Sequence, residues 1–285
     1  MKKVLVTGAN GQLGQCLRDI AGDYPDCEFM FTSREELPIE DEVKLTSFFA
    51  KNAIDYCINA AAYTNVEKAE SEETTAFRTN AEAVRTLAEK CREHRVTLVH
   101  VSTDYVFDGS KETPYSEEDE TGPINVYGAS KLKGEQYINE IGGACFIVRT
   151  SWLYSQYGHN FMKTVLRFAS EEKPLTVTEE QQGTPTNAND LARAIMEIVS
   201  SGSKAYGTYH FSNEGSTSWF EFARAILRHS GQNEHMNLVQ PGHYRTFAQR
   251  PKKSVLDKTR FKNTFAWEIP HWETSLQSLL QRTNN

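Results

Sequence analysis

A tyrosine and a lysine four residues apart, Tyr127 and Lys131, are the side chains in this sequence best suited to proton transfer. On a helix, positions i and i+4 lie one above the other on the same face. A lysine ammonium beside a phenol favours the phenolate, so it lowers the pKa of the phenol. A phenol tuned in this way can exchange a proton near neutral pH. Such a spacing also fits an ordinary surface pair, so other motifs must decide between the two readings.

A glycine-rich segment, TGANGQLG at positions 7–14, lies between an expected strand and an expected helix. Glycine permits the tight turn and lets the backbone approach a pyrophosphate, which the N-terminus of the helix then faces. The spacing is GxxGxxG rather than the commoner GxGxxG, and the alternative is an ordinary glycine-rich turn. We expect a dinucleotide site here, with contacts from Gly8, Asn10, Gly11, Gln12, Leu13 and Gly14.

The end of the second expected strand bears on the choice of nicotinamide cofactor. An acidic residue at this strand tip would hold a ribose 2′-hydroxyl, but the strand ends with Arg34. A guanidinium can pair with a 2′-phosphate and stack on adenine. This favours NADP(H), while the following Glu35 and Glu36 keep NAD(H) possible. A solvated surface arginine is the alternative.

Small residues follow the third expected strand, and hydroxyl and carboxyl groups follow the fourth. Ala60, Ala61 and Ala62 would let a cofactor lie against the backbone, although tight core packing explains them equally well. Ser102, Thr103 and Asp104 stand at a carboxyl strand end, where ligands bind in parallel sheets. A hydroxyl there could hydrogen-bond the carbonyl group that a neighbouring phenol protonates. Turn capping is the alternative for the threonine and the aspartate.

The elements that would position these groups alternate between strand and helix. We expect strands at 2–7, 28–32, 55–60, 96–101 and 145–148, and helices at 12–22, 42–51, 74–94 and 126–141. This order predicts a doubly wound parallel α/β sheet of Rossmann type, with the glycine-rich turn at its carboxyl edge. Residues 1–150 would form this cofactor-binding domain.

Residues 151–285 are less regular and predict a smaller mixed α/β lobe that binds substrate, with part of it returning to the first domain. The expected helices are 159–171, one from about 187 to 199, 218–230 and 272–281, and the expected strands are 174–178 and 207–212. Residues 218–221 match a capping box at the start of one of these helices.

Composition excludes several classes of protein. The chain has 285 residues, a net charge of −7 and 39% hydrophobic residues. That size supports a substantial core, and the charge argues against binding nucleic acid or an acidic membrane. Five cysteines without a CxxC motif predict a reducing cytoplasm and no disulfide framework. We expect no signal peptide, no membrane span and no metal site.

Taken together, the motifs resemble a known family. TGANGQLG, NAAAY, STDYVFDG and YGASK occur in the order and spacing of the extended short-chain dehydrogenase/reductases, over nearly the whole chain. The segments NVYGASKLKGE, RTSWLY, GTPTNANDLA, GTYHFSN and QRPKKS resemble in particular the members that reduce a 4-keto sugar nucleotide.

This resemblance implies that NADPH delivers hydride to C4 of dTDP-6-deoxy-L-lyxo-4-hexulose, giving dTDP-L-rhamnose. It makes Tyr127 the general acid and gives Lys131 two tasks, tuning the phenol and binding the nicotinamide ribose. Thr103 takes the place of the family's catalytic serine, with Asp104 beside it.

The resemblance also assigns substrate contacts and questions a metal. Trp152 is placed like the family's sugar-stacking residue, and Arg250 resembles a contact to the nucleotide diphosphate. Some members dimerise through Mg²⁺ held by carboxylates, but the matching position in the first helix is Cys16, a poor ligand for a hard cation. Asp190 remains a possible ligand. We therefore expect a monomer or a homodimer without a bridging Mg²⁺.

Two rival functions fit the same motifs. An epimerase or dehydratase of the extended family would keep its nicotinamide bound and recycle it. A non-catalytic NADP-binding regulatory subunit of methionine adenosyltransferase would have a similar fold. The intact Tyr127, Lys131 and Thr103 favour the reductase.

Overall fold

The computed structural model describes residues 1–232, 238–239 and 246–283. Its centre is a six-stranded parallel sheet with the order β10-β5-β4-β3-β1-β2. The strands are β1 (Lys2–Thr7), β2 (Cys27–Thr32), β3 (Tyr56–Asn59), β4 (Thr97–Thr103), β5 (Cys145–Thr150) and β10 (Gly207–His210). The prediction of a doubly wound parallel sheet is confirmed.

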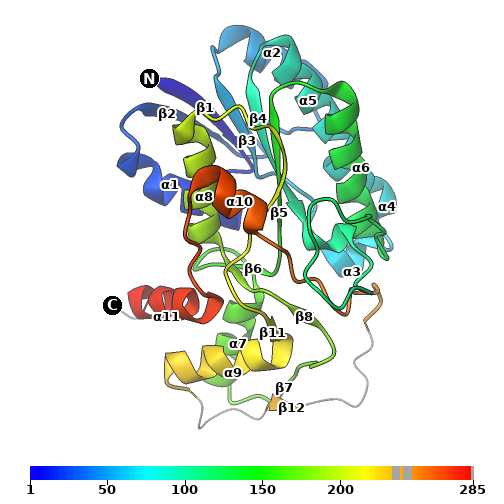
Figure 1. Ribbon diagram of the computed structural model, residues 1–285, viewed down its shortest axis with the longest axis vertical. Helices are drawn as coiled ribbons and strands as arrows, with labels where there is room; N and C mark the ends of the chain where they lie inside the picture. Colours follow the sequence, from blue (N-terminus) through cyan, green and yellow to red (C-terminus); the bar gives the residue numbers. More distant parts are fainter. Residues whose placement is uncertain (233–237, 240–245, 284–285) are drawn as a thin grey trace.

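Helices cover both faces of this sheet (Figure 1). One layer contains α2 (Glu42–Lys51), α5 (Ala83–Glu93) and α6 (Val126–Ile141), and the other contains α1 (Gln12–Ile20), α8 (Ala188–Ser201) and α10 (Thr259–Phe265). Successive residues of a strand point to opposite faces. In β1, Leu5 accordingly packs in the α2–α5 core, whereas Val4 and Val6 pack with α1 and α8.

The long helix expected at 74–94 is interrupted. It consists of α4 (Glu73–Phe77), a π-helical turn η2 (Arg78–Glu82) and α5. The π-helical turn carries Asn80, whose amide nitrogen donates to Ser130 Oγ on α6 at 3.0 Å and to the carbonyl oxygen of Tyr63 at 2.9 Å. Helical spacing in the sequence is nearly the same on either side of such a turn, so the pattern did not reveal it.

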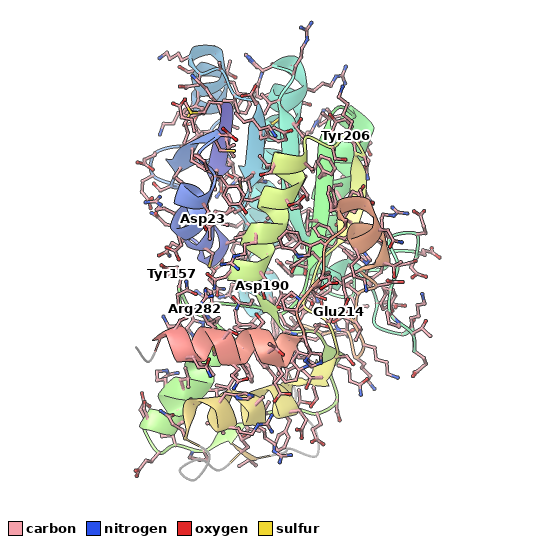
Figure 2. All side chains as sticks on the ribbon, turned by 60° about the vertical axis from the view of Figure 1, so that its left-hand side comes forward. Asp23, Tyr157, Asp190, Tyr206, Glu214 and Arg282 are labelled. Atoms are coloured by element: carbon pink, nitrogen blue, oxygen red, sulfur yellow. The ribbon has the colours of Figure 1, made fainter. Side chains whose placement is uncertain are left out.

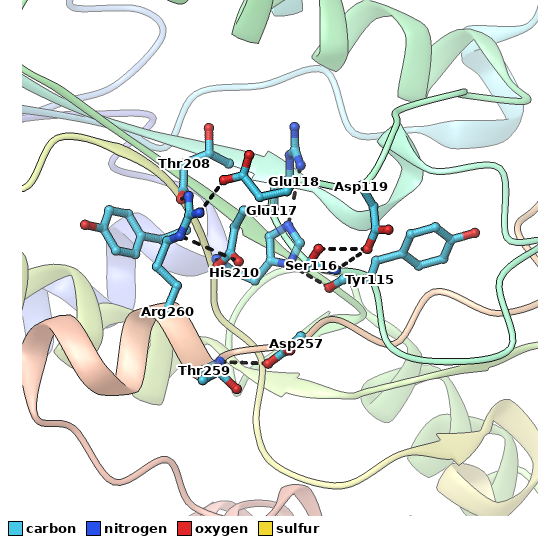
Figure 3. Close-up of polar contacts among 12 residues, drawn as sticks. Tyr115, Ser116, Glu117, Glu118, Asp119, Thr208, His210, Asp257, Thr259 and Arg260 are labelled. Atoms are coloured by element: carbon cyan, nitrogen blue, oxygen red, sulfur yellow. Dashed lines mark hydrogen bonds and ion pairs between the residues drawn. The ribbon is translucent and has the colours of Figure 1, made fainter.

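The chain returns to the first sheet after residue 187, since α8 packs against α1 and β10 pairs with β5. The loop at 110–124 is tied to this returning segment (Figure 3). The backbone N–H of His210 donates to Glu117 Oε1 at 2.9 Å, and Arg260 on α10 pairs with Glu118. These contacts join three segments that are distant in sequence.

A second lobe carries α7 (Phe161–Ser170), α9 (Trp219–Ser230) and α11 (Trp272–Thr283), which share one hydrophobic cluster. Three two-stranded sheets accompany them: β6 (Leu153–Tyr154) with β9 (Thr186–Asn187), β7 (Leu175–Thr176) with β12 (Leu238–Val239), and β8 (Gln182–Gly183) with β11 (Thr217–Ser218). Ser218 caps α9 as predicted, accepting from the N–H of Glu221 at 3.1 Å. Figure 2 shows Asp190 at the end of α8 that lies next to α11. Ser275 of α11 donates a hydrogen bond to Asp190.

Three further elements differ from the predictions. The strand expected at 174–178 is only the two-residue β7, and α3 (Val66–Ala69) and α10 were not expected. All five cysteines are free. Within the described ranges, no helix combines the length and the apolar character needed to cross a membrane.

Candidate functional site

A cavity of about 610 Å³ opens at the carboxyl edge of the sheet, between the sheet and the second lobe. It gathers residues from strand ends, the glycine-rich turn, α6 and the loop before β6. The predicted site residues that line it are Gly11, Gln12, Leu13, Ala60, Ala61, Ala62, Ser102, Thr103, Asp104, Tyr127, Lys131, Trp152 and Arg250. Thirteen positions scattered over 240 residues of sequence therefore face one space.

A neighbouring cavity of about 400 Å³ shares Gly11 and the three alanines with the first and extends to Gly8, Asn10 and Arg34. Gly8 has φ +66°, and a Cβ atom there would lie 2.6 Å from the backbone nitrogen of Ala61. Only glycine fits such a position. The two cavities together form a trough along the edge of the sheet.

Gly14 differs from the other residues of the glycine-rich segment. It lies beneath the turn, and an added Cβ atom would lie 2.5 Å from the Cα atom of Ala9. The residue is buried and is not part of the lining of either cavity. Glycine at this position permits the close packing of α1 on the turn.

Helix α6 presents Tyr127 and Lys131 to the larger cavity because its first turn is fixed at two points. The side chain of Asn125 caps the helix by accepting from the N–H of Gly128 at 2.7 Å. Gly128 lets the helix approach the Tyr105 carbonyl group, since a Cβ atom there would lie 2.1 Å from that oxygen. The Lys131 ammonium group donates to the carbonyl oxygen of Val101 at 2.7 Å.

The ionisation of this pair differs from the prediction made from charge alone. Burial raises the pKa of Tyr127 to about 12, more than its hydrogen bond with Thr103 lowers it. Burial also lowers the pKa of Lys131 to about 8, against the opposing effect of Glu135. The expectation that Lys131 brings the phenol pKa down towards neutral is therefore wrong for this structure, because desolvation dominates. A phenol that keeps its proton is suited to act as an acid.

Thr103 and Asp104 line the cavity and also hydrogen-bond within the turn that they begin. The Thr103 hydroxyl accepts from the N–H of Tyr105 at 3.2 Å and donates to Asp104 Oδ1 at 3.1 Å. Thr103 therefore caps the turn, as the alternative interpretation predicted, and lines the cavity as well. Burial raises the pKa of Asp104 to about 7, outweighing hydrogen bonds from Ser254 and Thr103.

Two buried hydroxyl groups that belong to the lining of the cavity have no protein partner among the described residues. They are those of Ser102 and Thr150. Buried hydroxyls are normally hydrogen-bonded, so these two are suited to a polar ligand in the cavity.

Three of the predicted ligand contacts, Trp152, Arg250 and Arg34, have protein partners. Trp152 is in the left-handed region with φ +46°, and its ring stacks on Trp219 with centroids 3.7 Å apart. Arg250 Nη2 pairs with Glu67 Oε1 on α3 at 2.7 Å.

Arg34 Nη2 pairs with Glu40 Oε1 at 3.3 Å. The carboxylate that faces Arg34 is thus Glu40, six residues away, rather than the adjacent Glu35 or Glu36.

Several residues near the site were missed by the sequence interpretation. Trp219 and His159 line the larger cavity, and Asn59 and His100 lie buried beside Lys131. The sequence could have indicated Asn59 and His100, because each is a polar residue inside or at the end of an apolar strand. Trp219 gave no comparable signal, since its position in the cavity depends on how the second lobe packs.

The positions considered for a metal are engaged in packing or hydrogen bonds. Cys16 is buried, and burial raises the pKa of its thiol to about 12. Asp190 accepts hydrogen bonds from Asn213 Nδ2 at 2.8 Å and from Ser275. In the part of the chain that the structure describes, no group of three or more His, Cys, Asp or Glu side chains could hold a metal ion.

Comparisons with known proteins find relatives along the whole chain. The family model described as the RmlD substrate binding domain matches residues 1–285. A dTDP-4-dehydrorhamnose reductase from Sinorhizobium fredii is 39% identical over 287 residues, covering 98% of this chain and 96% of that relative.

Two solved structures have a fold similar to that of this chain. The crystal structure of dTDP-4-dehydrorhamnose reductase from Bacillus anthracis, in complex with NADP, superposes with a TM-score of 0.94 at 36% identity and covers 99% of this chain and all of that one. The UDP-glucose 4-epimerase of Thermus thermophilus, in complex with NAD, has a TM-score of 0.83 at 18% identity and covers 99% of each chain, a likeness of fold alone.

Proposed function

This chain belongs to the RmlD substrate binding domain family, and we propose that it reduces the C4 keto group of dTDP-4-dehydro-L-rhamnose to dTDP-L-rhamnose with NADPH. The observation that carries the proposal is the convergence of Tyr127, Lys131, Thr103 and Asp104 on one cavity beside a glycine-rich turn. The relative from Sinorhizobium fredii, with 39% identity, is a dTDP-4-dehydrorhamnose reductase. Its match extends over the substrate lobe as well as the sheet, so it supports the substrate class and not only the fold.

The trough at the sheet edge fits a dinucleotide. Gly8 lets the turn pack tightly against the backbone of Ala61. The N-cap Gly11 of α1 has no side-chain cap, so the N–H groups of the first turn can face a pyrophosphate. Ser102 has a free buried hydroxyl, and Lys131 lies beside it to hold the nicotinamide ribose. Arg34 at the far end would meet a 2′-phosphate, with NADH as the weaker substrate. When bound, NADPH supplies the hydride.

The residues of the chain handle the proton. The Tyr127 phenol, protonated at neutral pH, donates its proton to the C4 oxygen as that oxygen becomes an alcohol. The Thr103 hydroxyl donates a hydrogen bond to the same oxygen and aligns the carbonyl group, with Asp104 accepting from that threonine in the absence of substrate. Lys131 lies one helical turn from the phenol, and its ammonium form, present below a pKa of about 8, stabilises the phenolate that remains.

The second lobe, mainly residues 151–285, would hold the rest of the substrate. A cavity of about 270 Å³ adjoins the larger one and shares His159, Asn160, Trp219 and Arg250 with it. We assign the sugar to the space beside Trp152 and the diphosphate to Arg250. The guanidinium must then exchange or share its contact with Glu67 when substrate binds.

The decisive measurement follows the loss of NADPH absorbance when the purified protein is mixed with the 4-keto sugar nucleotide, beside an NADH control. We expect one NADPH consumed for each product alcohol formed. Turnover of sugar without net NADPH consumption would instead indicate an epimerase. Absence of turnover together with binding to methionine adenosyltransferase would indicate the regulatory subunit.

A further inference from the structure

Three buried polar side chains form a row across the sheet, and one end of the row contacts Lys131. They are Thr7 on β1, Asn59 on β3 and His100 on β4. The strand register pairs Thr7 with Asn59 and Asn59 with His100, so the three point to the same face. Each side chain is at most 1% exposed. Polar groups buried to this extent need hydrogen-bond partners. The partner of each atom therefore shows whether that atom donates or accepts.

The contacts of Asn59 fix the orientation of its amide. Its Oδ1 atom accepts from the Thr7 hydroxyl at 2.7 Å and from the backbone N–H of Ala61 at 3.3 Å. Because a backbone N–H can only donate, the atom facing it must be the oxygen. The NH₂ group therefore faces His100 Nδ1, at 3.0 Å.

That orientation selects one tautomer of His100. The amide NH₂ only donates, so Nδ1 must accept and carries no hydrogen. In the neutral ring the hydrogen is then on Nε2, which lies 3.4 Å from the Nζ atom of Lys131. A neutral amine could accept this N–H, whereas an ammonium group would place a donor against a donor. The row therefore favours the neutral form of Lys131.

Other groups around Lys131 do not cancel this effect. The carbonyl oxygen of Val101, 2.7 Å from Nζ, accepts equally from an N–H of the neutral amine. Glu135, one turn further along α6, favours the ammonium form but is itself held by Arg149 of β5, with contacts of 2.7, 3.0 and 3.2 Å. Tyr127 is an uncharged phenol on the cavity side. From the packed turns η2 and η3 (Asp104–Val106), Asn80 is neutral and Asp104 acts on Tyr127.

We propose that His100, held as the Nε2–H tautomer by Asn59, is a positioning residue that sets the protonation state of Lys131. It thereby sets the basic limb of the pH dependence of the reduction. His100 is not part of the lining of the cavity, so it acts through Lys131 and not on the substrate. A lysine that releases its proton readily can return one to the Tyr127 phenolate, breaking an N–H bond and forming the phenol O–H bond. The kinetic part of this inference rests on the proposed function.

The substitution Asn59→Asp tests the tautomer. A carboxylate still accepts from Ala61 and Thr7, but it also accepts from His100, which moves the ring hydrogen to Nδ1 and leaves Nε2 bare towards Lys131. The ammonium form then gains an acceptor and a nearby negative charge. We expect the basic limb of kcat to move to higher pH by about one unit, with the KM for the sugar nucleotide unchanged within about two-fold.

The matched control is Thr7→Val, which removes a contact to the same amide while Ala61 still fixes its orientation. Its basic limb should coincide with that of the wild type. The inference would be overturned if the basic limb of kcat lay at the same pH in the wild type, Asn59→Asp and Thr7→Val.

A readout without catalysis keeps the test independent of the proposed function. Nitrogen-15 NMR of the histidine-labelled wild-type protein should show a bare Nδ1 and a protonated Nε2 for His100. A proton on Nδ1 would overturn the inference even if Asn59→Asp fails to fold. Absence of turnover in the wild type would count against the reductase function alone, because the NMR result does not depend on it.

Discussion

At the scale of single residues, burial matters more than neighbouring charge. Tyr127 and Lys131 lie one helical turn apart, as their spacing predicts, yet both pKa values move in the direction that desolvation requires. The spacing of two residues in a helix is visible in a sequence, whereas the depth at which the helix is buried is not. The consequence is a phenol that holds its proton firmly and a lysine that holds its proton loosely.

The proton of Tyr127 is the first feature to test by substitution. Tyr127→Phe keeps the ring and removes only the hydroxyl, so NADPH binding should remain. General acid catalysis contributes roughly 10²- to 10⁴-fold, and we expect a loss of kcat in this range. Turnover by steady-state absorbance and cofactor binding by fluorescence titration measure the two effects. Full activity of the variant would rule out this tyrosine as the acid.

The ion pair between Arg34 and Glu40 predicts how the cofactors are distinguished. Glu40 Oε1 also accepts from Thr79 at 2.8 Å, so the carboxylate stays beside Arg34 and would repel a 2′-phosphate. Glu40→Gln removes that repulsion and should lower the KM for NADPH by roughly two- to five-fold, with little change for NADH.

Arg34→Ala should weaken NADPH more than NADH. KM values for NADPH and NADH, measured for Arg34→Ala and the wild type, test this prediction. Equal effects on the two cofactors would remove Arg34 from the 2′-phosphate site.

Residues that line the larger cavity were predictable where they end or follow an apolar strand, or repeat at helical spacing. Thr103 and Asp104 are of the first kind, and Tyr127 and Lys131 of the second. Partners such as Glu67 for Arg250 were not predictable, because 183 positions separate them and only the fold brings them together. His100 lies between these cases, since a histidine in a strand core is visible but its contact with Lys131 is not.

At the scale of elements, most strands of the sheet and most helices that cover it were predictable. The close packing of one helix against another was not. Helix α6 spans Val126–Ile141 as expected, and α2 spans Glu42–Lys51 as expected. The π-helical turn η2, which contacts α6, was missed, because helical spacing is nearly the same on either side of it. A Cβ atom at Gly134 would lie 2.3 Å from the carbonyl oxygen of Asn80 in that turn.

Gly134→Ala therefore tests the contact between α6 and η2. In an exposed helix this change would stabilise by up to about 1 kcal/mol. Here it forces α6 away from backbone that cannot yield, so we expect a net loss of about 1–3 kcal/mol in the free energy of unfolding. Gly22→Ala is the control, because no atom lies within 4 Å of its added Cβ. Urea titration of both variants measures the difference, and a stabilised Gly134→Ala protein would contradict the close contact.

At the scale of the whole molecule, the chain closes on itself through β10 and the loop at 110–124. His210 lies at this junction, completely buried, with Nδ1 3.0 Å from the carbonyl oxygen of Tyr115 and Nε2 3.4 Å from Arg149 Nη1. Since a guanidinium only donates, Nε2 must accept and Nδ1 must donate, so the ring is neutral. No strand pattern predicts such a junction, because its contacts join positions about 60 and 95 residues apart.

This buried neutral histidine predicts that acid weakens the fold. Burial and the neighbouring Arg149 lower the pKa of His210 to about 3, whereas an unfolded histidine titrates near 6.5. Between these values the unfolded chain binds a proton that the folded protein rejects, so stability is fully present above pH 6.5 and falls as the pH decreases towards 3. From pH 7 to pH 5 this one group should remove about 2 kcal/mol.

Urea unfolding at pH 5, 6, 7 and 8 measures this dependence, and His210→Gln should reduce it. A glutamine amide can still accept from Arg149 and donate to Tyr115, but it does not titrate. His94→Gln changes an exposed histidine and should leave the dependence as in the wild type. Carboxylates contribute to the acid response of all three proteins, so the difference between the two variants isolates the buried ring. If both variants lose stability equally with pH, the junction at β10 is not the acid-sensitive part of this fold.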